Sequence, residues 1–277
     1  MNYKEDFVDI NGVKIHYLTI GEGKPVVFVH GWPLAFAPNH YLHEKLSKNF
    51  QLYFFDLPYY GKSGKLKGEH NFGDYSKVLD SFIKEMKIKK PVLISFSAGG
   101  VIAFKYVIEH QNEISGLVIC ASSNSNKHFN FKLKIYAKLF LWSYDNLFFV
   151  RSIVKNILQD ENKIKKFWKT VEPSANMDQK IIKDTLTAIK KIDIDVSRDL
   201  LEYMLKMDFT EDCKKIKIPT LLVSGEKDDL MPPKCLSEAH DLIENSEFII
   251  VPGADHSNVV NKEVSDRIHN FIQKRCF

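Results

Sequence analysis

The fold of this chain is decided by the stretch Pro91-Val92-Leu93-Ile94-Ser95-Phe96-Ser97-Ala98-Gly99-Gly100. Its apolar first half predicts a buried strand, its small residues predict a tight turn, and residues 101–110 predict an amphipathic helix. This order lifts one side chain above the edge of a sheet, and the residues two positions before and after it must be small. Ser95 and Gly99 meet that requirement around Ser97. The stretch therefore predicts an elbow that presents Ser97 as a nucleophile.

The elbow allows two other interpretations. If Ser95 were the nucleophile, Leu93 would occupy one of the small positions, and leucine is too bulky for it. Ser97 could also be an ordinary helix N-cap, a role that serine fills often. The strand and turn around it favour Ser97 as the nucleophile.

Short apolar runs recur on both sides of the elbow, with longer amphipathic segments between them. Six predicted strands are rich in β-branched or aromatic residues and lie at residues 26–29, 52–55, 92–94, 117–119, 220–223 and 248–251. Near-continuous hydrophobicity is typical of parallel strands covered by helices on both faces. Residues 7–10 and 13–20 flank Asn11-Gly12, a strong hairpin signal. We predict an α/β fold with a mostly parallel central sheet flanked by helices.

The alternation of strands and helices stops after Cys120 and resumes near Ile218. The intervening pattern is helical, so we expect a helical cap at residues 123–212, inserted into a core formed by residues 1–122 and 213–277. The cap contains many aromatic residues, and we expect most of them to pack inside it and a few to line an apolar substrate pocket. These residues are Phe129, Phe131, Tyr136, Phe140, Trp142, Tyr144, Phe148, Phe149, Phe167 and Trp168.

A general base and an acid are predicted at the ends of the last two strands. His256 follows residues 248–251, whereas the other late histidines lie within helical patterns. Asp228 follows residues 220–223, with Asp229 as the alternative acid. Because the carboxyl ends of parallel strands meet at one edge of a sheet, we expect Ser97, Asp228 and His256 to converge there as a catalytic triad.

Two further motifs resemble those of the α/β-hydrolase superfamily. His30-Gly31-Trp32-Pro33 is similar to its oxyanion loop, and residues 56–63 are similar to the loop after the next strand. The elbow departs from the family pattern only in having Ser95 where glycine is usual. The resemblance covers nearly the whole chain and implies an oxyanion hole formed by the backbone N–H groups of Trp32 and Ala98. It also implies a structural role for Asp56.

The function implied is that of a serine hydrolase resembling the carboxylesterases, which cleaves an ester or similar acyl bond of a small, partly apolar molecule. Lactonase activity, carbon–carbon bond hydrolysis and a non-enzymatic ligand sensor on the same fold are the alternatives. Trp32, Phe96, Trp142 and Trp168 are the candidate pocket residues. We expect no cofactor and no metal.

Composition bears on partners and location. The chain has 277 residues and a formal net charge of +4, with lysines interleaved among acidic residues, so we expect no nucleic-acid partner. Its four cysteines form no metal or redox motif, and the polar residues 1–6 are unlike a signal peptide. The most apolar window, residues 139–154, contains charged residues and is too short to span a bilayer. We therefore expect a cytoplasmic protein with no membrane partner.

Overall fold

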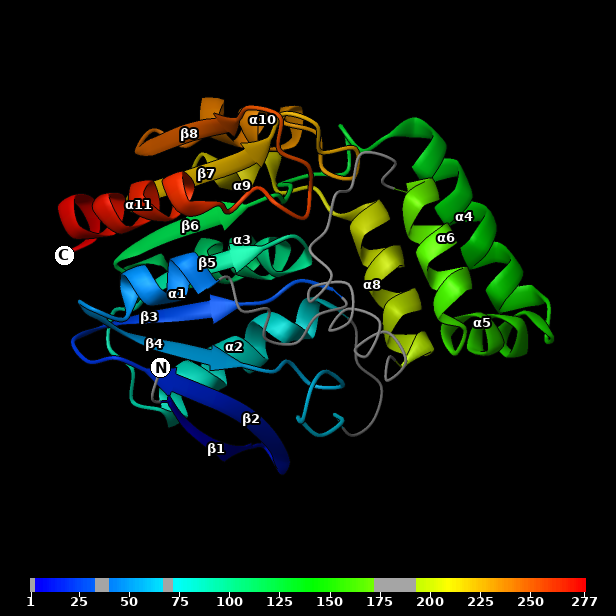
Figure 1. Ribbon diagram of the computed structural model, residues 1–277, viewed down its shortest axis with the longest axis horizontal. Helices are drawn as coiled ribbons and strands as arrows, with labels where there is room; N and C mark the ends of the chain where they lie inside the picture. Colours follow the sequence, from blue (N-terminus) through cyan, green and yellow to red (C-terminus); the bar gives the residue numbers. More distant parts are fainter. Residues whose placement is uncertain (1–2, 33–39, 67–71, 172–192) are drawn as a thin grey trace.

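The computed structural model describes residues 3–32, 40–66, 72–171 and 193–277. They form an eight-stranded sheet in the order β1-β2-β4-β3-β5-β6-β7-β8 (Figure 1). The strands are β1 (Tyr3–Ile10), β2 (Val13–Ile20), β3 (Lys24–Val29), β4 (Phe50–Phe55), β5 (Val92–Phe96), β6 (Gly116–Cys120), β7 (Thr220–Gly225) and β8 (Ser246–Val251). β2 is antiparallel to β1 and to β4, and the other pairs are parallel. The predicted α/β fold is confirmed, and every predicted strand lies within an observed one.

The hairpin turn between β1 and β2 follows from the local sequence. Asn11 and Gly12 have φ angles of 52° and 78°, the left-handed conformation that a two-residue turn requires. The chain then adds β4 on one side of β3 and β5 on the other. Where strand order reverses in this way, here between β3 and β5, a crevice forms at the carboxyl ends of the two adjacent strands. Here those ends carry the His30 loop and the Ser97 elbow.

Helices cover both faces of the sheet. α1 (His40–Leu46) packs against α11 (Lys262–Phe271), which continues into η3 (Ile272–Cys276), and both contribute to one hydrophobic cluster. The other cluster contains α2 (Tyr75–Glu85), α3 (Ala98–His110), α9 (Thr210–Cys213) and α10 (Lys234–Leu242). The short turns η1 (Phe72–Asp74) and η2 (Gln111–Glu113) precede α2 and follow α3.

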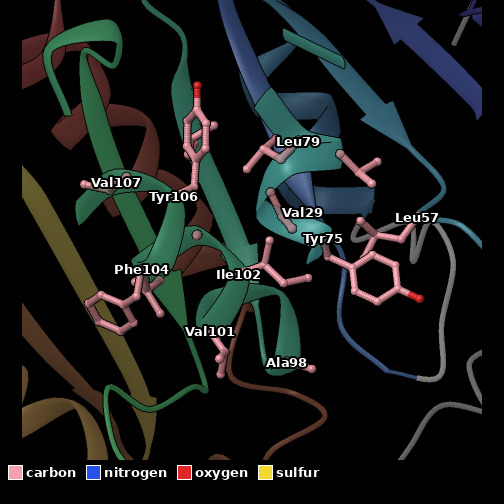
Figure 2. Packing of buried hydrophobic residues seen from close by; sticks show 14 of the residues in the cluster. Val29, Leu57, Tyr75, Leu79, Ala98, Val101, Ile102, Phe104, Tyr106 and Val107 are labelled. Carbon is pink, nitrogen blue, oxygen red and sulfur yellow. The ribbon is translucent and has the colours of Figure 1, made fainter. Parts of the chain in front are cut away.

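α3 is the central helix of the core. Phe104, Tyr106 and Val107 are fully buried. Ile102 and Ala98 belong to the same hydrophobic cluster as Val29, Leu57, Tyr75 and Leu79 of neighbouring elements (Figure 2). A fully buried side chain of this kind contributes about 1.5–3 kcal/mol to the free energy of unfolding. This packing fixes the start of α3, where Ser97 lies.

The cap helices α4 (Phe131–Asn146), α5 (Val150–Leu158), α6 (Glu161–Val171) and α8 (Ile194–Lys206) lie between β6 and β7 in the chain. They gather on the side to which the parallel strands point, with α8 nearest the sheet and α4 farthest from it (Figure 1). An antiparallel bridge between Ser125 and Asp208 closes the base of this insertion. Because α9 packs on α3 and α10, we place the second boundary of the proposed cap before α9 and not at residue 212.

The expectation that most cap aromatics form its interior is wrong for five of them. Phe131, Tyr136, Trp142, Phe148 and Phe149 are exposed. On α4, Tyr144 is buried and donates a hydrogen bond to Asp195 of α8, while no described residue covers the opposite side of the helix. A helix that packs through one side leaves its other side in solvent. None of the described helices is long and apolar enough to span a bilayer.

Candidate active site

The elbow holds Ser97 in a conformation that few non-glycine residues adopt, with φ 54° and ψ −126°. Two hydrogen bonds hold this backbone. The Ser97 N–H donates to the carbonyl of Cys120 at 3.0 Å, and the Ser122 hydroxyl donates to the carbonyl of Ser97 at 2.7 Å. Both partners belong to β6 and the loop after it, so the neighbouring strand fixes the strained turn.

Ser95, which replaces the usual glycine, is accommodated within the sheet. Its side chain is buried and its hydroxyl donates to the carbonyl of Val118 at 3.2 Å. A buried hydroxyl is tolerated when it is hydrogen-bonded. Ser95 therefore has a partner on β6, and its side chain is not the one presented at the elbow.

The loops that carry the acid and the histidine are joined to each other. The N–H groups of Glu226 and Lys227 donate to the carbonyls of Val251 and Ala254, at 3.1 and 2.8 Å. The Glu226 carboxylate accepts from the N–H of Gly253 at 2.7 Å. These bonds bring the loops after β7 and β8 side by side.

Ser97, His256 and Asp228 meet above the carboxyl end of the sheet. His256 Nε2 lies 2.9 Å from Ser97 Oγ, and His256 Nδ1 lies 2.8 Å from Asp228 Oδ2. All three side chains are buried. Because a carboxylate only accepts, Nδ1 carries the proton and donates to Asp228, which leaves Nε2 to accept from the serine.

Asp228, and not Asp229, is the acid that the structure places beside His256. Its second oxygen, Oδ1, accepts from the N–H groups of Leu230 and Met231 at 3.0 and 2.7 Å. Asp229 is exposed. The two backbone bonds orient the Asp228 carboxylate toward the imidazole.

The backbone of the predicted oxyanion loop lies very close to the backbone of the elbow. A Cβ atom at Gly31 would lie 2.9 Å from Cβ of Ser97, and one at Gly99 would lie 2.3 Å from the carbonyl oxygen of Val29. Only glycine fits at either position. The close approach places Gly31, the chain neighbour of Trp32, against Ser97. No described residue accepts a hydrogen bond from the backbone N–H groups of Trp32 and Ala98, the predicted oxyanion-hole residues.

The candidate pocket residues that the structure describes lie at different distances from the triad. The Phe96 ring lies 5.3 Å from the His256 ring, and the half-buried Trp32 lies in the oxyanion loop. Trp142 is 60% exposed on α4, the helix farthest from the sheet, so the structure does not place it beside the triad (Figure 1). The side chain of Trp168 lies outside the described residues.

Two residues that support the site were not predicted from the sequence. Ser122 is hydrogen-bonded to the elbow, and Ser197 of α8 accepts a hydrogen bond from the indole N–H of Trp32 at 3.1 Å. The second bond ties the cap to the oxyanion loop across 165 positions of sequence. A single serine with no motif around it gives no sequence signal that it will contact a residue so far away in the chain.

Asp255 and His30 organise the loops without joining the triad. The buried Asp255 carboxylate accepts from the N–H and hydroxyl of Ser257, at 2.8 and 2.6 Å. His30 Nε2 accepts from the N–H of Leu57 at 3.0 Å. These bonds stabilise the turn after His256 and link the oxyanion loop to the loop after β4.

The Cys120 thiol and the group of potential metal ligands among the described residues take no part in the triad. Burial raises the pKa of the Cys120 thiol to about 12, which keeps this neighbour of the elbow protonated. The one group of three potential metal ligands among the described residues is Asp80, His110 and Glu113. His110 ends α3, about 18 Å along the helix from its start. An ion there would be too far away to contact a substrate at Ser97.

Comparisons with known proteins agree with this architecture. A family model described as alpha/beta hydrolase fold matches residues 24–263. A pimeloyl-[acyl-carrier protein] methyl ester esterase of Wigglesworthia glossinidia brevipalpis is 30% identical over 259 residues, covering 86% of this chain and 89% of the relative. The enzyme of that name from Aliivibrio fischeri (strain ATCC 700601 / ES114) is 23% identical over 274 residues, covering 95% and 98%.

Solved structures show the same fold. An esterase from Exiguobacterium antarcticum superposes with a TM-score of 0.80 at 19% identity, covering 97% of this chain and 99% of the other. A bromoperoxidase from Bacillus anthracis gives 0.79 at 19% identity, covering 98% and 100%. The resemblance inferred from the sequence is confirmed: the chain belongs to the alpha/beta hydrolase fold family and is a hydrolase of that fold.

Proposed function

We propose that this enzyme cleaves carboxylic esters through an acyl-enzyme formed on Ser97. The observation that supports this most directly is the unbroken hydrogen-bonded chain from Ser97 Oγ through His256 to Asp228, at 2.9 and 2.8 Å. A hydroxyl so placed can lose its proton as it attacks a carbonyl carbon.

In the first half of the proposed reaction, His256 Nε2 takes the proton of Ser97 while Oγ bonds to the ester carbonyl carbon. Asp228 stabilises the imidazolium that forms. The N–H groups of Trp32 and Ala98 bind the developing oxyanion, each contributing about 3 kcal/mol in the transition state. When the tetrahedral intermediate collapses, the leaving alcohol takes the proton from His256.

In the second half, water replaces the alcohol. His256 removes a proton from the water as its oxygen attacks the acyl carbon, and the same oxyanion hole binds the second tetrahedral intermediate. Return of the proton to Ser97 Oγ releases the carboxylic acid. The cycle consumes one water molecule and needs no cofactor.

For the substrate we propose a short to medium acyl chain whose methyl ester is cleaved. The relatives' names support a methyl ester on a pimeloyl chain carried by acyl carrier protein. The Phe96 ring beside His256 and the half-buried Trp32 supply apolar surface for such a chain. We propose that the cap encloses it, since α8 contacts Trp32 through Ser197.

The test is hydrolysis of a panel containing acyl methyl esters, free and carrier-bound, together with lactones and a carbon–carbon bond substrate. We expect turnover of the esters, and a loss of about 10⁶-fold in kcat for Ser97→Ala because the nucleophile is absent. Ser95→Gly, which installs the usual glycine of the family, is the matched control and should remain active.

Three results would contradict the proposal. Undiminished ester turnover in Ser97→Ala would exclude Ser97 as the nucleophile. Turnover restricted to lactones or carbon–carbon bonds would move the enzyme to those classes. An absence of turnover on the whole panel, with ligand binding retained, would favour the sensor alternative.

A further inference from the structure

The outward side of α4 is an apolar stripe. Phe131, Ile135, Leu139 and Trp142 follow the spacing of one helix face, and each is exposed, Phe131 by 75%. A helix normally turns such a stripe toward the protein interior. Here Tyr144 is on the buried side instead, so the stripe faces solvent.

Exposed apolar residues also follow α4 in the turn that leads into α5. Phe148 is 91% exposed and its ring packs edge-on against that of Phe149, with 5.6 Å between the ring centroids. Eight of the twelve exposed large hydrophobic residues among those described belong to this one segment. We call them the cap patch: Phe131, Ile135, Tyr136, Leu139, Trp142, Phe148, Phe149 and Ile153. Exposed apolar side chains gathered in one segment in this way indicate an interaction surface.

Positive charge accompanies the cap patch. Residues 131–158 contain five basic residues, Lys132, Lys134, Lys138, Arg151 and Lys155, and a single acidic one, Asp145. The Asp145 carboxylate is already paired with Arg198, at 3.1 and 2.8 Å. Within the described residues, Lys132, Lys138 and Lys155 have no carboxylate partner. Residues 131–158 therefore present cations beside the cap patch, and their one acid is paired.

We propose that the cap patch binds the surface of an anionic lipid bilayer, with α4 lying in the plane of the headgroups. Lys132 follows Phe131 and Lys138 precedes Leu139, so ammonium groups stand at the borders of the apolar stripe. Lysines in that position reach the lipid phosphates while their alkyl stems and the apolar side chains enter the acyl boundary. Trp142 and Tyr136 are of the residue types enriched at this boundary.

This orientation has a consequence for the substrate. The cap lies on the side of the sheet where the parallel strands end, which is also the side of Ser97 (Figure 1). A bilayer under α4 would therefore face the end of the molecule that contains the triad. Binding at the bilayer surface needs no spanning segment, so the proposal departs from the expectation of no membrane partner. It does not depend on the proposed ester hydrolysis, and Ser97→Ala should bind vesicles as well as the wild type does.

The experiment is sedimentation of the full chain with phosphatidylcholine vesicles, with and without phosphatidylglycerol. We expect binding only to the anionic vesicles, weakened by salt. A Lys132→Glu/Lys138→Glu double variant should bind at least about 25-fold more weakly, since each lysine near an anionic surface contributes about fivefold. Lys4→Glu/Lys14→Glu, on the β1–β2 hairpin, makes the same charge change elsewhere and should bind normally.

The apolar contribution has its own variants and control. Phe131→Ser/Leu139→Ser should weaken binding at least about tenfold, because apolar area no longer enters the lipid. Ile250→Ser alters a residue that is 49% exposed on β8 and should have no effect. Brominated lipid should quench a fluorescence component that Trp142→Phe removes. Thermal unfolding of the exposed-site variants should match that of the wild type.

Several results would overturn the proposal. They are absence of binding to anionic vesicles, equal loss in the cap and control variants, and tryptophan quenching that persists in Trp142→Phe. A dimer that dissociates in Phe131→Ser/Leu139→Ser, seen by light scattering, would assign the cap patch to a second copy. Binding of an acidic carrier protein in place of vesicles would assign it to that partner.

Discussion

The part of the chain that the structure describes contains two buried histidine–aspartate pairs, and only one of them has the geometry of a catalytic pair. His256 lies 2.8 Å from Asp228, and His16 on β2 lies 2.7 Å from Asp56 in the loop after β4. Each pair also has a serine nearby: Ser97 in the first case, at the imidazole, and Ser63 in the second, whose hydroxyl accepts from the backbone N–H of His16 at 2.9 Å. Burial and a short histidine–carboxylate distance therefore do not distinguish them.

The second ring nitrogen makes the difference. His16 Nε2 lies 2.7 Å from a Glu5 carboxylate oxygen, so each of its ring nitrogens faces a carboxylate. The Ser63 hydroxyl donates to the Asp56 carbonyl at 2.6 Å. By contrast, His256 Nε2 faces the Ser97 hydroxyl. His256 therefore has a ring nitrogen that can accept the serine proton. His16 instead joins two carboxylates and holds β1, β2 and the loop after β4 together.

Exchanging the acid of each pair for its amide should separate the two roles most strongly. Asp228→Asn should lower kcat by up to about 10⁴-fold, because an amide favours the wrong imidazole tautomer. Asp56→Asn should change kcat by less than about tenfold, since His16 contacts no reacting atom. Steady-state ester hydrolysis measures both.

Asp229→Asn is the matched control for the acid, since it is the exposed neighbour of Asp228. Normal activity is expected of it. A loss in Asp229→Asn with activity kept in Asp228→Asn would reverse our assignment of the acid.

The structural pair should instead appear in stability. Asp56→Ala leaves His16 Nδ1 without its hydrogen-bond partner in a buried site, a change that costs about 1–3 kcal/mol in the free energy of unfolding. Urea unfolding should show this loss, with Asp56→Asn intermediate. Unchanged stability in both variants would mean that the pair does not hold the hairpin to the sheet.

The smallest predicted effect concerns the acyl pocket beside the catalytic pair. A buried methylene is worth about 0.8 kcal/mol, so each added acyl carbon should raise kcat/KM about fourfold until the pocket is full. An ester series from acetyl to decanoyl with one leaving group measures this. A flat profile, or a decline from acetyl onward, would contradict an apolar pocket.

The fold could be predicted from local patterns because its strands are short, apolar and separated by amphipathic segments. The elbow, Asn11-Gly12 and the loops that carry Asp228 and His256 are all marked by small or turn-forming residues. Parallel strands that end at one edge predict that these loops converge. Predicting the fold therefore requires little beyond these local sequence patterns.

What sequence patterns left open depends on contacts between distant segments. Asp228 and Asp229 are adjacent and chemically alike, and only the backbone bonds to Leu230 and Met231 orient one of them. The Ser197–Trp32 bond joins the cap to the oxyanion loop. The exposure of Trp142 depends on which side of α4 meets α8, which the aromatic content of the cap does not reveal.

The central claim, that His256 activates Ser97 while His16 leaves Ser63 inert, is tested most directly by a fluorophosphonate probe. Mass spectrometry of the digested protein should find the label on the peptide containing Ser97, and His256→Gln should slow labelling whereas His16→Gln, in whatever fraction folds, should not. A label on Ser63 or Ser95, or labelling of Ser97 at the same rate without His256, would contradict the account.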